Sequence, residues 1–268
     1  MLVAKHARKM IDTILEELSN WNIPKRLVAA RVLQRIIVLC ESGITQHLNR
    51  LVAEYFNANG EDELSILNEI QLAVRLTGYF VEPETYIPMV WSYLRPEYAT
   101  SPVLVSNVLQ VFSLLLQGTN PNTVNWPVLV DGITTKLMSC HFVMYGDSHT
   151  VKQSCLQVIE SLLTCFREHH TFGASSIDSG VLSHAVSTSM FILIVKLCAQ
   201  RGISKQVAET GVQLLDQIRA LKQLSTVAEL YQVHFQEAIT EITRDVASWD
   251  KTSPNLYQSV TTGRSVTL

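Results

Sequence analysis

The chain has 268 residues, of which 47% are hydrophobic and only 17% are charged. This composition excludes an intrinsically disordered chain, because disordered chains are rich in charge and poor in aliphatic side chains. The formal net charge of −3, from 21 basic and 24 acidic residues, leaves no basic excess for binding a nucleic-acid backbone or an anionic membrane.

Apolar residues recur every three or four positions along most of the chain, which is typical of amphipathic helices. The first clear pattern runs to Cys40, with Pro24 in the first turn of the helix, and Ser101-Pro102 opens a later helix. The other predicted helices cover 44–57, 66–80, 83–96, 122–139, 149–169, 181–201, 204–223 and 225–249. With only 11 glycines and 8 prolines, the chain is a poor candidate for a sandwich or barrel. The sequence therefore predicts an all-α fold.

A step of 39 residues relates successive apolar positions. The related triplets are Leu48/Ile87/Trp126, Leu51/Val90/Leu129, Tyr55/Leu94/Ile133, Leu27/Ile66/Val105, Leu33/Leu72/Val111 and Ile37/Leu76/Leu115. Two antiparallel helices in each period of about 40 residues match the HEAT/armadillo class of α-solenoid. The same alignment predicts that Leu72 is buried between the helices that carry Leu33 and Val111.

The repeats define the expected domain organisation. The solenoid is expected to cover residues 1–250, with a looser repeat after residue 140. The polar segment 251–268 is expected to form a loosely ordered C-terminal tail.

The five cysteines form no C-x-x-C pair, and their odd number does not suit a disulfide framework. The first ten residues carry Lys5, Arg8 and Lys9 without the apolar segment of a signal peptide. The longest apolar run, 190–195, is far shorter than the ~20 residues that span a bilayer. We therefore expect a cytoplasmic protein with reduced thiols and no membrane partner.

Neither a phosphate-binding glycine loop nor a hydrolase or metalloprotease motif occurs in the sequence. Cys140 and His141, with Asp147 and His149, are possible metal ligands, but a polar connection between helices is the favoured interpretation. His169-His170 fits a helix C-terminus better than a ligand pair. Trp91 and Trp126 lie on apolar helix stripes, where core packing is favoured over ligand stacking. We expect no catalytic residue, metal or cofactor.

Amide side chains recur on the predicted second helices of successive repeats. Second helices line the inner surface of such a solenoid, and amides offer both donors and acceptors to an extended peptide or a helix. This amide row is the candidate partner-binding site, against the alternative of an ordinary solvated helix face. It consists of Asn68, Gln71, Arg75, Asn107, Gln110, Gln153 and Gln157.

Several ordered segments resemble one family of repeat proteins. These are 26–33 (RLVAARVL), 44–48 (ITQHL) and 77–84 (TGYFVEPE), with the later stretches 207–231 and 234–249. The chain is similar, from about residue 20 to 260, to the middle repeats of the HEAT-repeat axonemal dynein assembly factors.

The resemblance implies a non-enzymatic cytoplasmic scaffold that preassembles dynein arms for motile cilia. It further implies binding of axonemal dynein subunits, the intermediate chain in particular, beside chaperones. Two alternatives stay open: a HEAT-repeat scaffold of the transport-receptor or phosphatase-scaffold type, and a HEAT-like DNA glycosylase. The glycosylase is the least favoured, because base excision needs a strongly basic groove that this composition does not suggest.

Overall fold

The computed structural model describes residues 2–58, 61, 63–95, 97–99, 101–120, 124–140, 148–173, 182–199 and 204–247. The chain divides into two compact units, Met1–Val124 and Asn125–Leu268, which are described separately below. Within the described ranges, the regular structure is entirely helical and no strand occurs. The predicted all-α repeat fold is confirmed.

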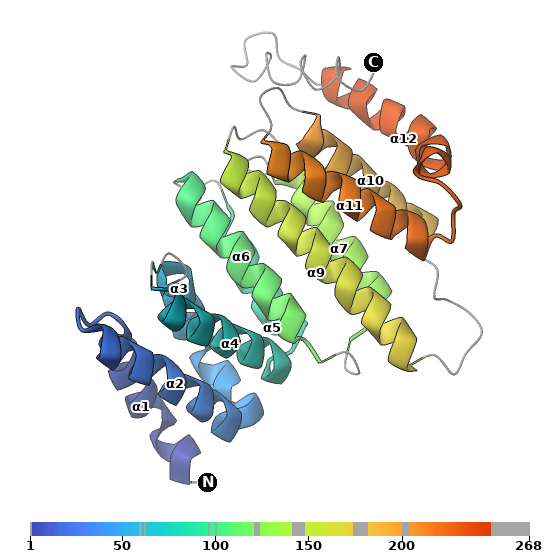
Figure 1. The fold of residues 1–268 in the computed structure, drawn as a ribbon. Helices are drawn as coiled ribbons and strands as arrows, with labels where there is room; N and C mark the ends of the chain where they lie inside the picture. Colours follow the sequence, from blue (N-terminus) through green and yellow to red (C-terminus); the bar gives the residue numbers. More distant parts are fainter. Residues whose placement is uncertain are drawn as a thin grey trace. The chain divides into compact units, whose positions relative to one another are not determined.

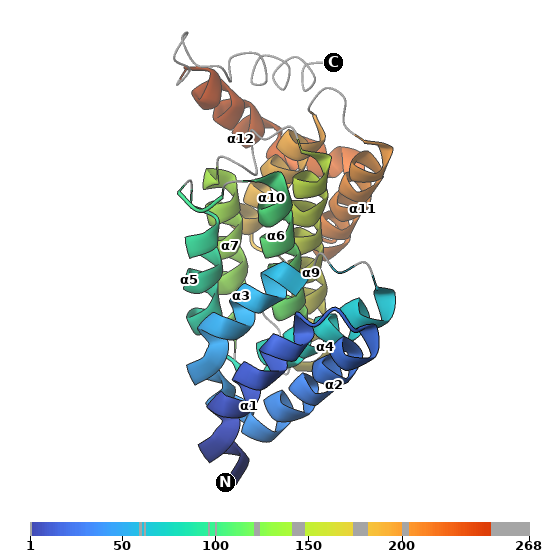
Figure 2. The same cartoon turned by 90° about the vertical axis from the view of Figure 1, so that its left-hand side faces the viewer.

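Unit 1 is built from helices that alternate between two layers (Figures 1 and 2). The closest packing joins α1 to α2, α2 to α4 and α4 to α6, so that α2, α4 and α6 are successive neighbours. The elements are α1 (Leu2–Leu18), α2 (Ile23–Cys40), the 3-10 helix η1 (Glu41–His47), α3 (Leu48–Ala58), α4 (Leu64–Phe80), α5 (Pro83–Tyr93) and α6 (Pro102–Gly118).

Side-chain caps and prolines explain where these helices begin. The Asn22 side chain accepts a hydrogen bond from the Lys25 N–H, and the Ser101 side chain accepts one from the Leu104 N–H. Each cap satisfies an N–H group that the first turn leaves without a partner. Pro24 and Pro102 then occupy first-turn positions, where no donor is needed.

The helix predicted to start at residue 44 starts later. Residues Glu41–His47 form a 3-10 helix and α3 begins at Leu48. Glu41 has a φ of 48°, which breaks the α-helical hydrogen-bonding pattern directly after α2. The other boundaries in unit 1 agree with the predictions to within about three residues.

The prediction for Leu72 is wrong. Its side chain is 42% exposed, whereas Leu33 and Val111 are completely buried. Helices α2, α4 and α6 begin at residues 23, 64 and 102, so their spacings are 41 and 38 residues rather than a constant 39. A slip of one residue rotates a side chain by about 100° around the helix axis. Ala73 therefore takes the buried position expected for Leu72.

Buried tyrosine–threonine pairs tie the two helix layers of unit 1 together. The Tyr55 hydroxyl lies 2.9 Å from Thr77 Oγ1, and the Tyr86 hydroxyl lies 2.8 Å from Thr119 Oγ1. Each threonine hydroxyl also contacts a backbone carbonyl of its own helix segment. The polar ends of these large buried rings are thus satisfied inside the core, as burial requires.

Two glycines set the distance between α4 and α6. A Cβ atom on Gly78 would overlap the backbone carbonyl of Leu115, and one on Gly118 would overlap that of Arg75. The backbones of the two helices therefore lie very close to each other in their C-terminal halves. Backbones this close tolerate no side chain at either glycine.

Unit 2 continues the helical pattern, with α9 packed on α11, and α10 in contact with α7, α11 and α12 (Figure 1). Its elements match the predicted helices closely. They are α7 (Trp126–Ser139), α9 (His149–Gly173), α10 (His184–Cys198), α11 (Lys205–Leu221) and α12 (Val227–Ala247). The predicted tail, 251–268, lies outside the described residues.

Both tryptophans have the packing roles expected of them. Trp126 is fully buried at the start of α7. Trp91 packs edge-on against Phe112, with ring centroids 5.5 Å apart. These side chains therefore belong to the helix packing.

Candidate partner-binding surface

The exposed side of α4 carries a row of four side chains that differ in chemical type. Asn68, Leu72, Arg75 and Tyr79 follow one another at intervals of three or four residues and are all exposed. The buried residues of α4 form a separate stripe, which begins at Ile66. The helix thus presents a polar, an apolar, a cationic and an aromatic side chain in sequence along one face.

Helix α2 lies beside α4 and is aligned with it by polar contacts. Arg31 Nε donates to Glu69 Oε1 over 2.8 Å, and Gln34 Nε2 donates to Glu69 Oε2 over 2.6 Å. Arg26 forms an ion pair with Glu61, just before α4. The later residue of α2 contacts the later residue near α4, since Arg26 pairs with Glu61 and Arg31 with Glu69. Helices α2 and α4 therefore run in the same direction.

These contacts define one surface, named here the α2–α4 face. On α2, the exposed residues 31, 35 and 38 are spaced by four and three positions, so they lie on one side of the helix together with the Arg31 contact to α4. The α2–α4 face consists of Arg31, Arg35, Val38, Asn68, Leu72, Arg75 and Tyr79.

Charge is distributed unevenly between the two helix layers of unit 1. Helices α2, α4 and α6 carry five basic residues and one acidic residue, a formal charge of +4: Lys25, Arg26, Arg31, Arg35 and Arg75 against Glu69. Helices α1, α3 and α5 carry four basic and five acidic residues, a formal charge of −1: Lys5, Arg8, Lys9 and Arg50 against Asp12, Glu16, Glu17, Glu54 and Glu84. The helices of the layer that includes the α2–α4 face thus carry the excess positive charge, and the flanking Glu41, Glu61 and Glu63 offset part of it.

Glu69 is the single carboxylate within these three helices, and it is already engaged. Hydrogen bonds from Arg31 and then from Gln34 lower its pKa below the usual range. It therefore stays ionised and neutralises Arg31. Arg35 and Arg75 have no such carboxylate among the described residues.

The structure places the predicted amide row partly on this surface. Asn68 is exposed, and Gln71 is half-buried on the side of α4 that turns toward α6. Arg75 Nε donates to Gln117 Oε1 on α6 over 3.1 Å. Gln110 lies on the same side of α6 as Gln117. Its Nε2 donates to Ser106 Oγ over 3.4 Å. These residues remain candidates for partner binding.

Two members of the predicted row have contacts inside the fold. Asn107 Nδ2 donates to the carbonyl oxygen of Phe56 over 3.1 Å and so satisfies an acceptor at the end of α3. In unit 2, Gln153 Nε2 contacts Thr210 Oγ1 over 3.3 Å and links α9 to α11. Gln157 is half-buried on α9. The structure thus brings Asn68, Gln71, Arg75, Asn107 and Gln110 onto neighbouring helices of unit 1, with Gln153 and Gln157 in unit 2.

The metal candidates of the sequence are only partly described. His141 and Asp147, and the side chains of His169 and His170, lie outside the described residues. Among the residues that are described, no three His, Cys, Asp or Glu side chains form a cluster that could hold a metal ion. In the same residues, no helix has the length and apolarity needed to cross a membrane.

Three of the cysteines, Cys155, Cys165 and Cys198, lack the environment of reactive thiols. Burial raises the pKa of Cys165 to about 12 and that of Cys198 to about 11. Burial raises the pKa of Cys155 as well. A thiol reacts as its thiolate, and these three are protonated at neutral pH.

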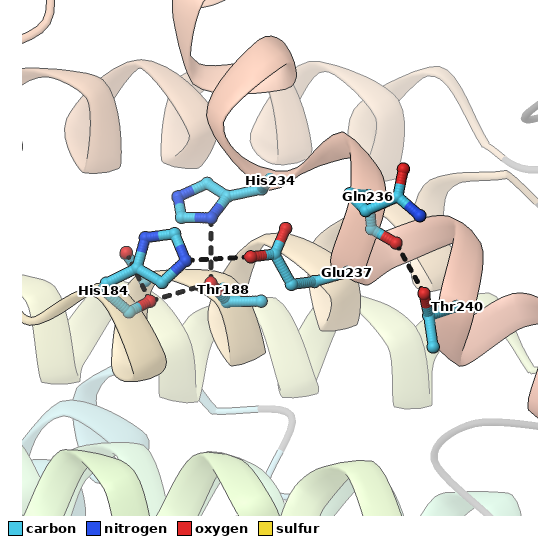
Figure 3. Close-up of polar contacts among 7 residues, drawn as sticks. His184, Thr188, His234, Gln236, Glu237 and Thr240 are labelled. Carbon is cyan, nitrogen blue, oxygen red and sulfur yellow. Dashed lines mark hydrogen bonds and ion pairs between the residues drawn. The ribbon is translucent and has the colours of Figure 1, made fainter.

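A polar cluster that the sequence did not single out joins α10 to α12 (Figure 3). His184 Nε2 lies 3.0 Å from Glu237 Oε1, and Thr188 Oγ1 lies 2.9 Å from His234 Nδ1. His234 is completely buried, and its pKa is lowered to about 4, first by burial and then by the charges of His184 and Lys222. The cluster therefore fixes α12 on α10 with His234 uncharged at neutral pH.

Beside this cluster lies a groove of about 630 Å³ between α7, α10 and α12. Glu237 and Glu241 contribute its carboxylates, and hydroxyl side chains contribute most of its other polar groups. Glu237 contacts His184, and Glu241 forms an ion pair with Lys196 over 3.5 Å. Because both carboxylates already have partners, the α2–α4 face is the better candidate for a binding surface.

A comparison with known families places this architecture. Residues 1–187 match the family model described as dynein axonemal assembly factor 5, HEAT-repeat domain. The chain belongs to this family. Its members thus share the helical repeats that carry the α2–α4 face here.

The relatives that match are longer proteins. The chain is 23% identical over 257 residues to dynein axonemal assembly factor 5 of Homo sapiens, covering 96% of this chain and 28% of that protein. It is 21% identical over 249 residues to the Mus musculus protein, covering 92% of this chain and 26% of that protein. The chain thus spans about a quarter of the length of these dynein axonemal assembly factor 5 relatives. No solved structure matches it.

Of the α2–α4 face, the predicted amide row includes only Asn68 and Arg75. It does not include the cationic residues Arg31 and Arg35 or the apolar and aromatic residues Val38, Leu72 and Tyr79. The constant step of 39 residues predicts a buried Leu72, and the predicted amide row does not include Gln117. The spacing within α4 itself held the missing signal: Ile66, Ile70 and Ala73 define a buried stripe that excludes Leu72. Similarly, Gln117 follows Gln110 by seven residues, which is two helical turns on the same side.

Proposed function

We propose that this chain is a non-enzymatic scaffold for the cytoplasmic preassembly of axonemal dynein arms, which are needed in motile cilia. In this role it binds axonemal dynein subunits, the intermediate chain in particular, and acts beside chaperones. Membership of the dynein axonemal assembly factor 5 family supports a role in the assembly of axonemal dynein. The observation that carries a binding role is the α2–α4 face, with exposed arginine, aromatic, aliphatic and amide side chains on two aligned helices.

The surface chemistry suits a protein ligand. Arg and Tyr are enriched in protein interfaces, where they combine apolar contact area with directional hydrogen bonds. The amides of Asn68, Gln71 and Gln110 add donors and acceptors for an extended backbone or a helix laid across the helices. A repeat scaffold offers such contacts along an extended surface rather than in one deep pocket.

The test is capture of dynein subunits from the cytosol of ciliated cells by the immobilised full chain. We expect the intermediate chain among the captured proteins, and less of it with the triple variant Asn68→Ala, Gln71→Ala, Gln110→Ala. The thermal midpoint of this variant should stay nearly unchanged, because the three side chains are exposed or half-buried.

A matched control replaces one asparagine and two glutamines elsewhere. Asn57, Gln206 and Gln232 are exposed and lie on α3, α11 and α12. Their combined change to alanine should leave capture intact. If both triple variants lose capture of dynein subunits equally, the amide row is not part of the binding site. Recovery of transport cargo or phosphatase subunits in place of dynein chains would instead favour a scaffold of the alternative kind.

A further inference from the structure

The charge asymmetry of unit 1 points to the chemistry of its partner. The chain as a whole has a net charge of −3, yet helices α2, α4 and α6 together carry +4 within their bounds, although Glu41, Glu61 and Glu63 directly flank them. Charge complementarity between surfaces steers association and selects partners. A partner of this layer should therefore present carboxylates.

Two arginines of the α2–α4 face are available to such carboxylates. Arg26 and Arg31 are neutralised by Glu61 and Glu69. Arg35 is exposed, and the described residues offer it no carboxylate. Arg75 donates from Nε to Gln117 Oε1, and the described residues offer its guanidinium no carboxylate. A guanidinium held in this way can receive a carboxylate with two parallel hydrogen bonds.

Apolar side chains alternate with these cations. Leu72 lies one turn before Arg75 on α4, and Tyr79 lies one turn after it, with 52% of its surface exposed. Val38 follows Arg35 on α2 and is also exposed. Arg and Tyr side chains are enriched at protein interfaces, and Leu72 and Val38 add apolar contact area beside them. A matching ligand must therefore alternate acidic and apolar side chains.

This pattern favours a protein segment over a nucleic acid. Tight binding to a phosphate backbone draws on many cationic contacts, on the order of 6–10, and weakens steeply with salt. The α2–α4 face offers Arg35 and Arg75 without internal carboxylate partners, and Leu72 and Val38 have no role in binding phosphates. An amphipathic acidic peptide uses both sets of side chains at once.

We infer that the α2–α4 face binds an acidic, amphipathic segment of a protein partner, with carboxylates on Arg35 and Arg75 and apolar side chains on Leu72 and Tyr79. The inference rests on the proposed scaffold function and specifies the class of segment recognised. It assigns the electrostatic selectivity to α2 and α4, and it leaves Asn68 to contact the peptide backbone.

The test uses the full chain and a fluorescein-labelled synthetic peptide of leucine and glutamate, patterned as one amphipathic helix. Two further peptides serve as probe controls: one with the same composition in scrambled order, and one with glutamine in place of every glutamate. Fluorescence polarisation at low and at physiological salt gives the Kd for each. We expect the patterned acidic peptide to bind most tightly and to weaken as salt increases.

The decisive variant is the double charge reversal Arg35→Glu, Arg75→Glu. Two reversed contacts at an exposed surface should raise the Kd for the acidic peptide about tenfold. The matched control is Arg8→Glu, Lys9→Glu on α1, which changes the charge equally on exposed positions of the other layer. This control should leave the Kd within about twofold. A thermal melt of each variant verifies that the fold is retained.

Several results would overturn the inference. These are failure of the acidic peptide to bind the wild-type chain, equal losses in the two double variants, or binding of the scrambled peptide as tight as that of the patterned one. Tighter binding of single-stranded DNA or RNA than of the peptide would assign the surface to nucleic acid instead. Leu72→Ala gives a second readout, because it should weaken peptide binding without changing the salt dependence.

Capture of dynein subunits separates this inference from the proposed function. If Arg35→Glu, Arg75→Glu abolishes peptide binding but dynein capture is intact, the inference fails while the scaffold function stands. If the acidic peptide binds as expected but the native chain captures no dynein subunit, the function fails while the inference about the surface stands.

Discussion

Single residues in this fold show how strongly one helical position decides between core and surface. Leu33 on α2 is fully buried, whereas Leu72 on α4 is 42% exposed, although the sequence pattern pairs them. Ala73, next to Leu72, takes the buried position. The amino-acid type is thus a weak guide, and the phase of the helix is decisive.

This difference predicts opposite effects for two identical substitutions. Leu33→Ala removes fully buried methyl groups and leaves a cavity, so it should lower the free energy of unfolding by about 2–5 kcal/mol. Leu72→Ala should change it by no more than about 1 kcal/mol, because 42% of the side chain is already exposed to water. Chemical denaturation of both variants measures the difference. Similar losses would show that the assignment of α4 residues to core and surface is wrong.

The buried His234 predicts a pH dependence of stability. Its pKa is about 4 in the folded chain against an ordinary 6.5, because burial, His184 and Lys222 disfavour its charged form and only Glu237 favours it. The unfolded chain therefore binds more protons between these two values. The stability that the neutral imidazole contributes is present above pH 6.5 and is lost as the pH falls toward 4.

The full shift corresponds to a loss on the order of 3 kcal/mol, at about 1.4 kcal/mol for each pH unit. Thermal melts between pH 7 and pH 4.5 measure it, because the midpoint should fall with pH. His234→Gln keeps a polar partner for Thr188 and cannot be protonated, so its midpoint should vary less over this range. A variant as pH-sensitive as the wild-type chain would attribute the effect to other groups.

At the scale of the helix, local signals predicted most elements. Asn22-Ile-Pro and Ser101-Pro carry capping chemistry that depends only on neighbouring residues, and α2 and α6 begin there. The separation of successive helices could not be predicted in the same way. It depends on how closely two helices pack, and that is set by residues 37 to 43 positions apart, such as Gly78 with Leu115 and Gly118 with Arg75.

The close approach of α4 and α6 predicts a large effect of one methyl group. Gly78→Ala would place a Cβ against the Leu115 backbone, which cannot move aside as a side chain can. The two helices must separate, and we expect a loss of about 2–3 kcal/mol in the free energy of unfolding. Gly132→Ala on α7 is the matched control, because no atom lies within 4 Å of the added Cβ. That change should be neutral or stabilise the chain by up to about 1 kcal/mol. Urea denaturation distinguishes the two, and a stabilising Gly78→Ala would show that the helices are not in contact there.

At the scale of the molecule, the overall composition does not indicate where the candidate binding surface lies. A net charge of −3 suggested no electropositive surface, and that is correct for the sum. The fold separates the charges into layers, with +4 on α2, α4 and α6 and −1 on α1, α3 and α5. Which helices share a layer follows from repeat packing, and on this basis the sequence predicts an amide row on α4 and α6. Which side chains are exposed on them depends on the exact phase, so Leu72 and Gln117 were missed.

The division into units predicts that the binding surface works without unit 2. Helices α2 and α4 lie between α1 and α6, and the contacts that orient the face, Arg31 with Glu69 and Arg75 with Gln117, are all within Met1–Val124. In repeat proteins each element is stabilised by its nearest neighbours, so a fragment of residues 1–124 should fold as a helical unit. We expect a cooperative melt in far-UV circular dichroism and a Kd for the acidic peptide within about threefold of the full-chain value, roughly 0.6 kcal/mol. A coil-like spectrum would show that unit 1 depends on residues beyond 124 for its fold. A helical fragment that fails to bind the peptide would show that the surface itself is incomplete without them.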